Sequence, residues 1–108
     1  GDSRIVFKVK PALAPIKVNI LPLIKKRHAE EAKKLYKELS RHFMVQYDES
    51  GSIGKRYRRG DAVGVPFAVT IDDNTLENGT VTVRDRDSME QKEIVLADLV
   101  QYLHDNLS

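Results

Sequence analysis

The chain has 108 residues, a length that suits one domain with a single hydrophobic core. It is 41% hydrophobic and 31% charged, which is too apolar for a disordered segment, and the absence of cysteine excludes disulfides, zinc-thiolate sites and cysteine nucleophiles. Residues 1–60 carry 15 basic and 6 acidic residues (+9), whereas residues 61–108 carry 3 and 10 (−7). This asymmetry favours a surface that faces a polyanion, although a basic helix and acidic turns that merely keep the domain soluble would produce it too.

The chain begins with a lead-in segment, residues 1–15, ahead of one domain over residues 16–108. Residues 4–10 alternate as an edge strand would, before Pro11 and Pro15 interrupt any pairing. Because the chain opens on Gly1 rather than methionine, we expect an excised or processed fragment. No apolar run reaches the ~18–20 residues that cross a bilayer, so no membrane contact is expected.

The first half of the domain predicts a strand, a helix and a second strand. Residues 16–23 form an apolar run typical of a strand that is covered on both faces, and residues 44–47 suit a short strand. Between them, residues 28–43 predict a helix, because apolar residues recur at i, i+3, i+4, i+7 and i+11 from Ala32. A crossover of this kind between parallel strands is right-handed in nearly all proteins.

Residues 48–64 contain four glycines and four basic residues. Ser50 or Ser52 can cap a helix that starts near Ile53, and Gly64 suits its end. Gly60 inside this helix costs about 1 kcal/mol relative to alanine, so a structural reason for it is expected.

The rest of the chain predicts three strands and a last helix. Residues 66–72 form a second buried strand, the pair Asn78-Gly79 indicates a two-residue hairpin, and residues 80–84 and 90–95 form two more strands around a polar turn. Leucines and a valine at helical spacing from Leu96 to Leu107 predict an amphipathic helix. The order β-α-β-α-β-β-β-α indicates an α/β fold with three layers, α/β/α, around a mixed sheet.

Catalytic and metal-binding motifs are absent from the sequence. His28, His42 and His104 are far apart and are interpreted as surface or capping residues. No HExxH, GxSxG or GxGxxG pattern occurs, and the run from Gly51 to Lys55 is too short for a phosphate-binding loop of the Walker type. We therefore expect no catalytic residue, no metal site and no cofactor in this chain.

Two segments are candidates for RNA binding. The first runs from Lys55 to Arg59 and places four cations around Tyr57. Arg58 and Arg59 can neutralise phosphates, and a tyrosine ring can stack on an unpaired base. A solvated helix face with Tyr57 packed inward is the alternative.

The second segment is Arg84-Asp85-Arg86-Asp87. In an extended strand the two arginines would share one face and the two aspartates the other. Arginine donates to base acceptors, and aspartate accepts from an amine such as N4 of cytosine, so the mixture suits the reading of cytosine edges. A salt-bridged turn is the alternative.

These segments resemble the C-terminal anticodon-binding domain of the glycyl-tRNA synthetases, which are class II aminoacyl-tRNA synthetases. The resemblance covers PALAPIKVNILPL (11–23), residues 47–91 and the last helix, and its most specific part is SGSIGKRYRR followed by TVTVRDRDSMEQ. Gly60 departs from the family, which usually has glutamine or another residue there, and Asp61-Ala62-Val63 replaces the usual Asp-Glu-Ile.

The resemblance implies an α/β/α domain with a five-stranded mixed sheet that holds the anticodon loop of glycine tRNA, whose anticodon ends in two cytosines. Tyr57 or Phe67 would stack a base, Arg58 and Arg59 would hold phosphate, and residues 84–87 would read or frame the cytosines. The implied full-length enzyme is a cytoplasmic homodimer that uses ATP and Mg²⁺ in another domain, whereas the isolated domain is expected to be a monomer. The alternative is an accessory or scaffold domain of the same fold, as in a mitochondrial DNA polymerase subunit, that acts through protein contacts.

Overall fold

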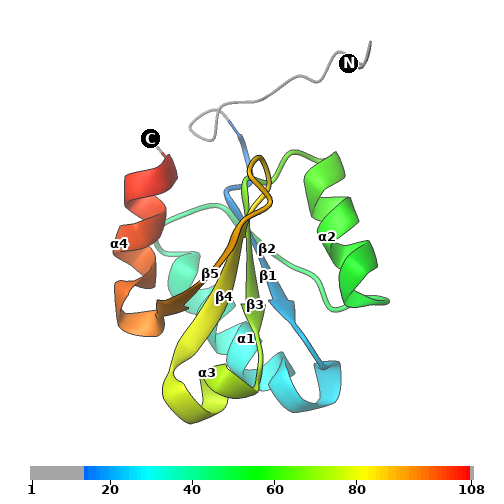
Figure 1. The fold of residues 1–108 in the computed structure, drawn as a ribbon, viewed down its shortest axis with the longest axis vertical. Coiled ribbons are helices and arrows are strands. Elements are labelled where there is room, and N and C mark those ends of the chain that lie inside the picture. The colour runs from blue at the N-terminus through cyan, green and yellow to red at the C-terminus, as the bar shows by residue number, and fades with distance from the viewer. Residues whose placement is uncertain (1–13, 108) are drawn as a thin grey trace.

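A computed structural model describes residues 14–107, which form a five-stranded mixed sheet covered by helices on both faces (Figure 1). The strand order is β2-β1-β3-β4-β5. The α/β fold and the five strands expected from the sequence are thus confirmed, and the predicted edge strand over residues 4–10 lies outside the described residues. The elements in chain order are β1 (Val18–Pro22), α1 (Lys25–Leu39), β2 (Val45–Tyr47), α2 (Ile53–Ala62), β3 (Phe67–Ile71), α3 (Asp73–Asn78), β4 (Thr80–Asp85), β5 (Gln91–Val95) and α4 (Leu96–Leu107).

The path of the chain places the helices on opposite faces of the sheet. β1 is parallel to both β2 and β3, whereas β4 and β5 run antiparallel. The crossover through α1 moves from β1 to one neighbour, and the crossover through α2 returns past β1 to the other. The two crossovers have the same hand but run in opposite directions across the sheet, so α1 and α2 lie on opposite faces. Figure 1 shows α2 alone on its face, opposite α4.

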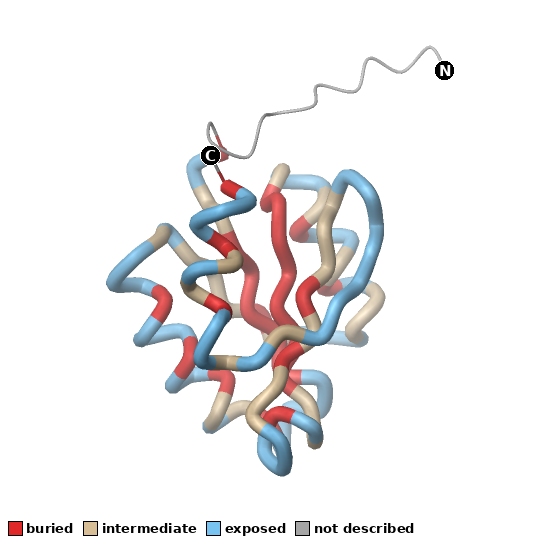
Figure 2. Tube along the Cα trace, turned by 60° about the vertical axis from the view of Figure 1, so that its left-hand side comes forward, coloured by how far each residue is buried: buried red, intermediate tan, exposed pale blue. Residues whose placement is uncertain are grey.

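The face toward α1 and α4 contains the hydrophobic core. Alternate residues of the central strands point to this face and pack against leucines of the two helices, and the central strands are buried along most of their length (Figure 2). The core consists of Val18, Ile20, Ala32, Leu35, Leu39, Phe67, Val69, Ile71, Val81, Val83, Leu99, Leu103 and Leu107. The strand residues that alternate with these, such as Asn19 and Thr70, point to the other face and are buried beneath α2.

The connection between β3 and β4 differs from the predicted hairpin. A short helix, α3, fills it, and Gly79 is its left-handed C-cap (φ 70°) rather than part of a two-residue turn. The N-cap is Asp72, whose side chain accepts from the N–H of Thr75 while the Thr75 hydroxyl accepts from the N–H of Asp72. An Asn-Gly pair suits a hairpin and a helix end equally, because both need a positive φ, and here the reciprocal cap selects the helix.

The charge asymmetry of the sequence becomes an asymmetry in space. Residues 14–60 carry 12 basic and 5 acidic residues (+7) and form β1, β2, α1 and most of α2, whereas residues 61–107 carry 3 and 10 (−7) and form β3 to β5, α3 and α4. Since β2 and β1 occupy one side of the sheet and β4 and β5 the other, the domain has a cationic side and an anionic side.

Candidate nucleic-acid interface

Helix α2 is the element that carries the first predicted segment, and Arg56 fixes its beginning. The Arg56 side chain is only 5% exposed and donates to the backbone carbonyls of Pro22, Ser50 and Gly51. Ser52 is the N-cap, accepting from the N–H of Lys55 at 3.3 Å, so the second of the two predicted caps is confirmed. One of the four cations of this segment is therefore a structural tie between α2 and the end of β1.

Tyr57 lies on the side of α2 that faces the sheet. Its hydroxyl is 2.6 Å from the Thr70 hydroxyl of β3, and its ring lies under the Arg84 guanidinium, 5.0 Å from the ring centre. Arg84 in turn donates two hydrogen bonds to Asp61, at 3.0 and 3.1 Å. This inward packing is the alternative that the sequence left open for Tyr57, and it ties the middle of α2 to β3 and β4.

Gly60 permits α2 to approach the sheet closely. Gly60 is buried, and a Cβ atom at this position would lie 3.1 Å from Nδ2 of Asn19 on β1. Asn19 is 1% exposed, and neither its Nδ2 nor its Oδ1 has a hydrogen-bond partner among residues 14–107. The expected reason for a glycine inside the helix is thus the side chain of Asn19.

The outer side of α2 presents its other cations to solvent. Lys55 and Arg58 are exposed, and together with Arg59 and Ala62 they line an open depression of about 390 Å³. Within residues 14–107, no hydrogen bond or ion pair is recorded for Arg58, so its guanidinium has its donors free for a ligand.

Arg59 is partly committed to Asp48, which follows β2. Its Nε and Nη2 atoms donate to the Asp48 carboxylate at 3.0 and 2.8 Å, and Nη2 also donates to the carbonyl of Ser50. Burial raises the pKa of the Asp48 carboxyl, but the hydrogen bonds from Arg59 and from the N–H of Ser50 outweigh burial and hold that pKa below its ordinary value. The Arg59 side chain remains 45% exposed, so its outer edge still faces the depression.

The second predicted segment forms the end of β4 and a tight turn. Arg84 and Arg86 both face the region beneath α2, as predicted from strand alternation. Asp85 accepts from the N–H groups of Asp87 and Ser88, and Arg86 donates to the Asp87 carboxylate. All four charged side chains therefore have partners inside the domain, which is the salt-bridged arrangement named as the alternative.

Phe67 belongs to the hydrophobic core. It is 3% exposed and makes an edge-on contact with Tyr102 of α4, at 6.3 Å between ring centres. A ring in this position has no face open to an unpaired base, because the sheet and α4 cover it.

Several residues that shape this interface were missed in the sequence, among them Asp48, Asp61 and Thr70. A helical wheel could have found Asp61, since Arg56, Tyr57, Gly60 and Asp61 fall on one face at i, i+1, i+4 and i+5. Asp48 and Thr70 lie far along the chain from their partners, so no local spacing indicates them.

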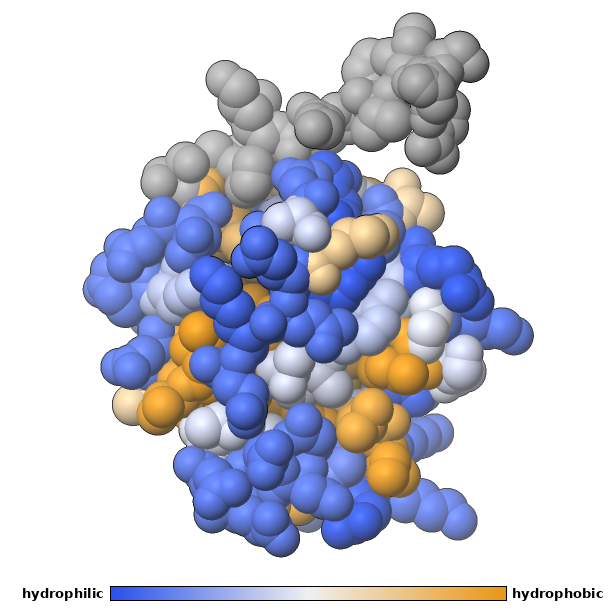
Figure 3. Space-filling view, in the orientation of Figure 1, coloured by the Kyte–Doolittle hydropathy of each residue, from blue (hydrophilic) through white to orange (hydrophobic). Residues whose placement is uncertain are grey.

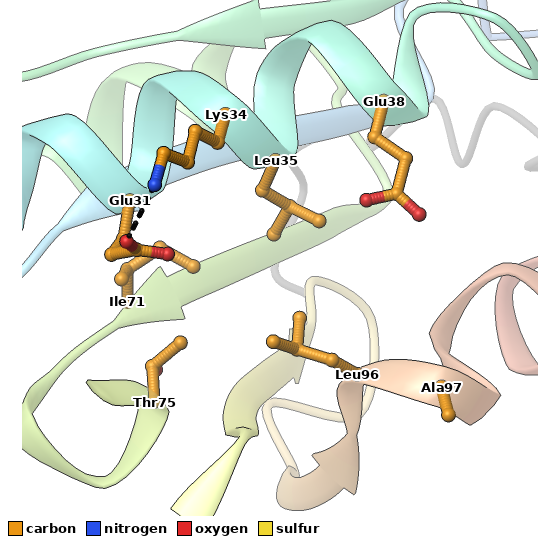
Figure 4. A pocket seen from close by; sticks show the side chains of 8 residues that line it. All are labelled: Glu31, Lys34, Leu35, Glu38, Ile71, Thr75, Leu96 and Ala97. Carbon is orange, nitrogen blue, oxygen red and sulfur yellow. Dashed lines mark hydrogen bonds and ion pairs between the residues drawn. The ribbon is translucent and has the colours of Figure 1, made fainter. Parts of the chain in front are cut away.

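A different hollow lies on the opposite face of the sheet, between α1, the end of β3 and the start of α4 (Figure 4). It has a volume of about 380 Å³, an aliphatic floor and two carboxylates on its rim, and its lining residues are Glu31, Lys34, Leu35, Glu38, Ile71, Thr75, Leu96 and Ala97. The carboxylates disfavour a polyanion here. In the view of Figure 3, which has α4 on the left and α2 on the right, the surface is mainly hydrophilic and its apolar residues lie in separate patches. None of the helices formed by residues 14–107 has the length and apolar character that a bilayer crossing needs.

Comparisons with known proteins agree with this architecture. A family model described as "Anticodon binding domain" matches residues 14–106. The chain is 58% identical to a glycine–tRNA ligase of Clostridium perfringens over 98 residues, which are 91% of this chain and 21% of that protein. It is 54% identical to a glycine–tRNA ligase of Borreliella burgdorferi over 104 residues, 95% of this chain and 23% of that protein.

A solved structure has the same fold. The RNA-binding domain of threonyl-tRNA synthetase from Cryptosporidium parvum superimposes with a TM-score of 0.83 at 27% sequence identity, covering 92% of this chain and 25% of that chain. The chain thus spans roughly a quarter or less of the length of these relatives, as a single domain would.

Proposed function

This chain belongs to the anticodon-binding domain family, and from that premise we propose that it holds the anticodon loop of glycine tRNA as one domain of a glycine–tRNA ligase. The identity of 58% to a glycine–tRNA ligase supports this function over an accessory or scaffold domain that acts through protein contacts.

The observation that carries the proposal is the outer side of α2. Lys55, Arg58 and Arg59 surround one open depression, while the inner side of the same helix is tied to three strands through Arg56 and Tyr57. Because α2 is held in place, its cations lose less conformational entropy when they neutralise phosphates. Arg58 and the outer edge of Arg59 are proposed to hold phosphates of the loop.

The remaining predicted residues are proposed to act mainly by framing the site. Arg84 is already bidentate to Asp61 and Arg86 is bonded to Asp87, so these pairs fix the position of α2 and of the β4–β5 turn. Asp85 supports that turn through its amides. The geometry supports a packing role for Phe67 and a positioning role for Tyr57, whose ring is covered by Arg84, rather than the stacking role suggested by sequence.

The full-length enzyme is proposed to supply everything else. The chain covers about a fifth of the ligases it resembles, and no catalytic motif occurs in it. Aminoacylation with ATP and Mg²⁺, the homodimer and the cytoplasmic location are therefore proposed for the whole ligase. This chain alone is expected to form no glycyl-adenylate.

A gel-shift titration of this chain with glycine tRNA tests the proposal. Replacing either of the two cytosines of the anticodon should weaken binding about 5- to 150-fold, since one good base contact is worth about 1–3 kcal/mol. Arg58→Ala should weaken binding to every tRNA alike, because a phosphate contact carries no sequence information. Lys92→Ala, a change at an exposed lysine on β5, is the matched control and should have little effect. Equal affinity for tRNAs with unrelated anticodons would overturn the proposal.

A further inference from the structure

Helix α1 has a stripe of cations that the proposed anticodon site does not use. Lys26, Lys33 and Lys37 recur with helical spacing, and Arg41 follows in the turn just beyond the helix end. All four are exposed, and the three lysines lie opposite the buried side formed by His28, Ala32, Leu35 and Leu39. Glu30 is the one carboxylate on this stripe. From Lys26 to Lys37 the stripe runs about 16 Å along the helix axis.

The stripe is distinguished from the other cations of α1 by its lack of close ion pairs. Lys25, Arg27 and Lys34 are paired with Glu49, Asp73 and Glu31 at 3.6, 2.9 and 3.2 Å. Within the described residues, none of the four cations of the stripe makes an ion pair within 4.0 Å, although Lys33 lies 6.0 Å from the centre of the Tyr47 ring and its charge helps to lower the pKa of the Glu49 carboxyl. The α1 cations thus divide into a set held in ion pairs and a set without them, and both sets are exposed to solvent.

The position of the stripe adds to its field. α1 packs against β1 and β2, on the side of the sheet where residues 14–60 concentrate a net charge of +7. Charges of one sign gathered on one side attract and orient an approaching polyanion, and the anionic side repels it. An RNA bound at α2 would therefore be drawn toward the edge of the sheet that α1 also covers.

The make-up of the stripe favours a helical over a single-stranded RNA. Sites for single strands combine cations with aromatic platforms for the bases. Tyr36, beside the stripe, is 37% exposed, but its ring makes an edge-on contact with Tyr47 at 6.3 Å. Lys33 and Lys37 stand one turn apart, about 6 Å along the axis, so the two lysines can neutralise phosphates of one backbone together.

We propose that the α1 stripe, Lys26, Lys33, Lys37 and Arg41, binds the phosphate backbone of the double-helical stem that carries the anticodon loop. The inference rests on the proposed function, because it takes glycine tRNA as the RNA. The contact would add affinity and orientation without reading sequence, since phosphates carry no base information.

The test compares the salt dependence of binding for two RNAs: a stem-loop with the glycine anticodon, and the loop sequence alone as a single strand. The variant is Lys33→Gln with Lys37→Gln, and the control is Lys92→Gln. For the stem-loop, the slope of log K against log salt should fall in magnitude by about 1.4–1.8 in the variant, since each lost phosphate contact removes about 0.7–0.9. For the single strand the slope should not change, and Glu30→Gln should tighten binding of the stem-loop only.

A variant slope equal to that of the Lys92→Gln control, or an equal loss with both RNAs, would overturn the stem contact. Circular dichroism checks the fold, and the substituted side chains are exposed, so unfolding midpoints should stay unchanged. Failure of the proposed function has a different signature: the stem-loop with an altered anticodon would bind as tightly as the original, whatever the slope of the variant.

Discussion

The pair formed by Arg84 and Asp61 offers the sharpest test of whether the charged segment at the end of β4 is structural. Replacing Arg84 by alanine removes two charge-assisted hydrogen bonds, at 3.0 and 3.1 Å, and a cation over the Tyr57 ring. The Arg84 side chain is only 11% exposed, so little water takes its place, whereas Asp61 is 30% exposed and regains part of its hydration.

The magnitude follows from these exposures. Hydrogen bonds to charged groups are worth about 1.5–3 kcal/mol, and a cation over an aromatic ring adds about 0.5–1 kcal/mol. Because Asp61 is partly rehydrated, we expect Arg84→Ala to lower the free energy of unfolding by about 2–3 kcal/mol. For a domain near 100 residues this lowers the melting temperature by roughly 10 °C.

Thermal and urea unfolding, followed by circular dichroism, measure this effect. Arg86→Ala is the comparison: the Arg86 side chain is 14% exposed, but its partner Asp87 is 44% exposed and adjacent in sequence, so the change should cost less than Arg84→Ala, about 1 kcal/mol. A melting temperature that stays within about 2 °C for Arg84→Ala, together with a large loss of tRNA affinity, would refute the structural role and indicate direct contact with the RNA.

Two further predictions concern Asp48 and Gly60. The folded pKa of Asp48 lies below its unfolded value of about 3.9. The contribution of Asp48 to the free energy of unfolding is therefore fully present above that pH and is lost as the pH falls through the folded pKa. Urea unfolding from pH 6 to 2.5 should show a steeper loss of stability in acid for the original chain than for Asp48→Asn. Gly60→Ala should lower stability by about 1 kcal/mol, because the new Cβ would lie 3.1 Å from the packed Asn19 side chain, yet in an Asn19→Ala background the same change should raise stability by about 1 kcal/mol through helix propensity. Destabilisation of equal size in both backgrounds would show that Asn19 is not the obstacle.

The sequence was sufficient for the elements with strong periodicity and insufficient for contacts between distant parts of the chain. All five strands and the three longer helices were predicted, although α1 begins at Lys25 and ends at Leu39 rather than covering residues 28–43. The helix starts early because Ile24 and His28 close its first turn, with the N–H of Ile24 donating to Nδ1 of His28, a contact that leaves no mark in the apolar period. The short helix α3 was missed because its only signal, Asp72 followed three residues later by Thr75, was outweighed by Asn78-Gly79.

The candidate site was predicted at the level of segments but not of individual side chains. Spacing placed Arg84 and Arg86 on one face, yet their partners Asp61 and Asp87 depend on how α2 and the turn are folded. Composition alone did not distinguish a cation that faces solvent, such as Arg58, from one that satisfies backbone carbonyls, such as Arg56. Which of these two roles a cation has depends on whether its side chain is buried, and burial is set by tertiary structure.

The two faces of the sheet hold their helices by different forces, and this has a consequence for how the domain loosens. The layer of α1 and α4 is held mainly by apolar packing, whereas the layer of α2 depends on directional hydrogen bonds, such as the one between the Tyr57 and Thr70 hydroxyls. Guanidinium chloride at high concentration screens charges and competes for backbone carbonyls. The layer containing α2 should therefore detach while α1 and α4 remain packed on the strands. Helix α2 would then be the first part of the domain to unfold.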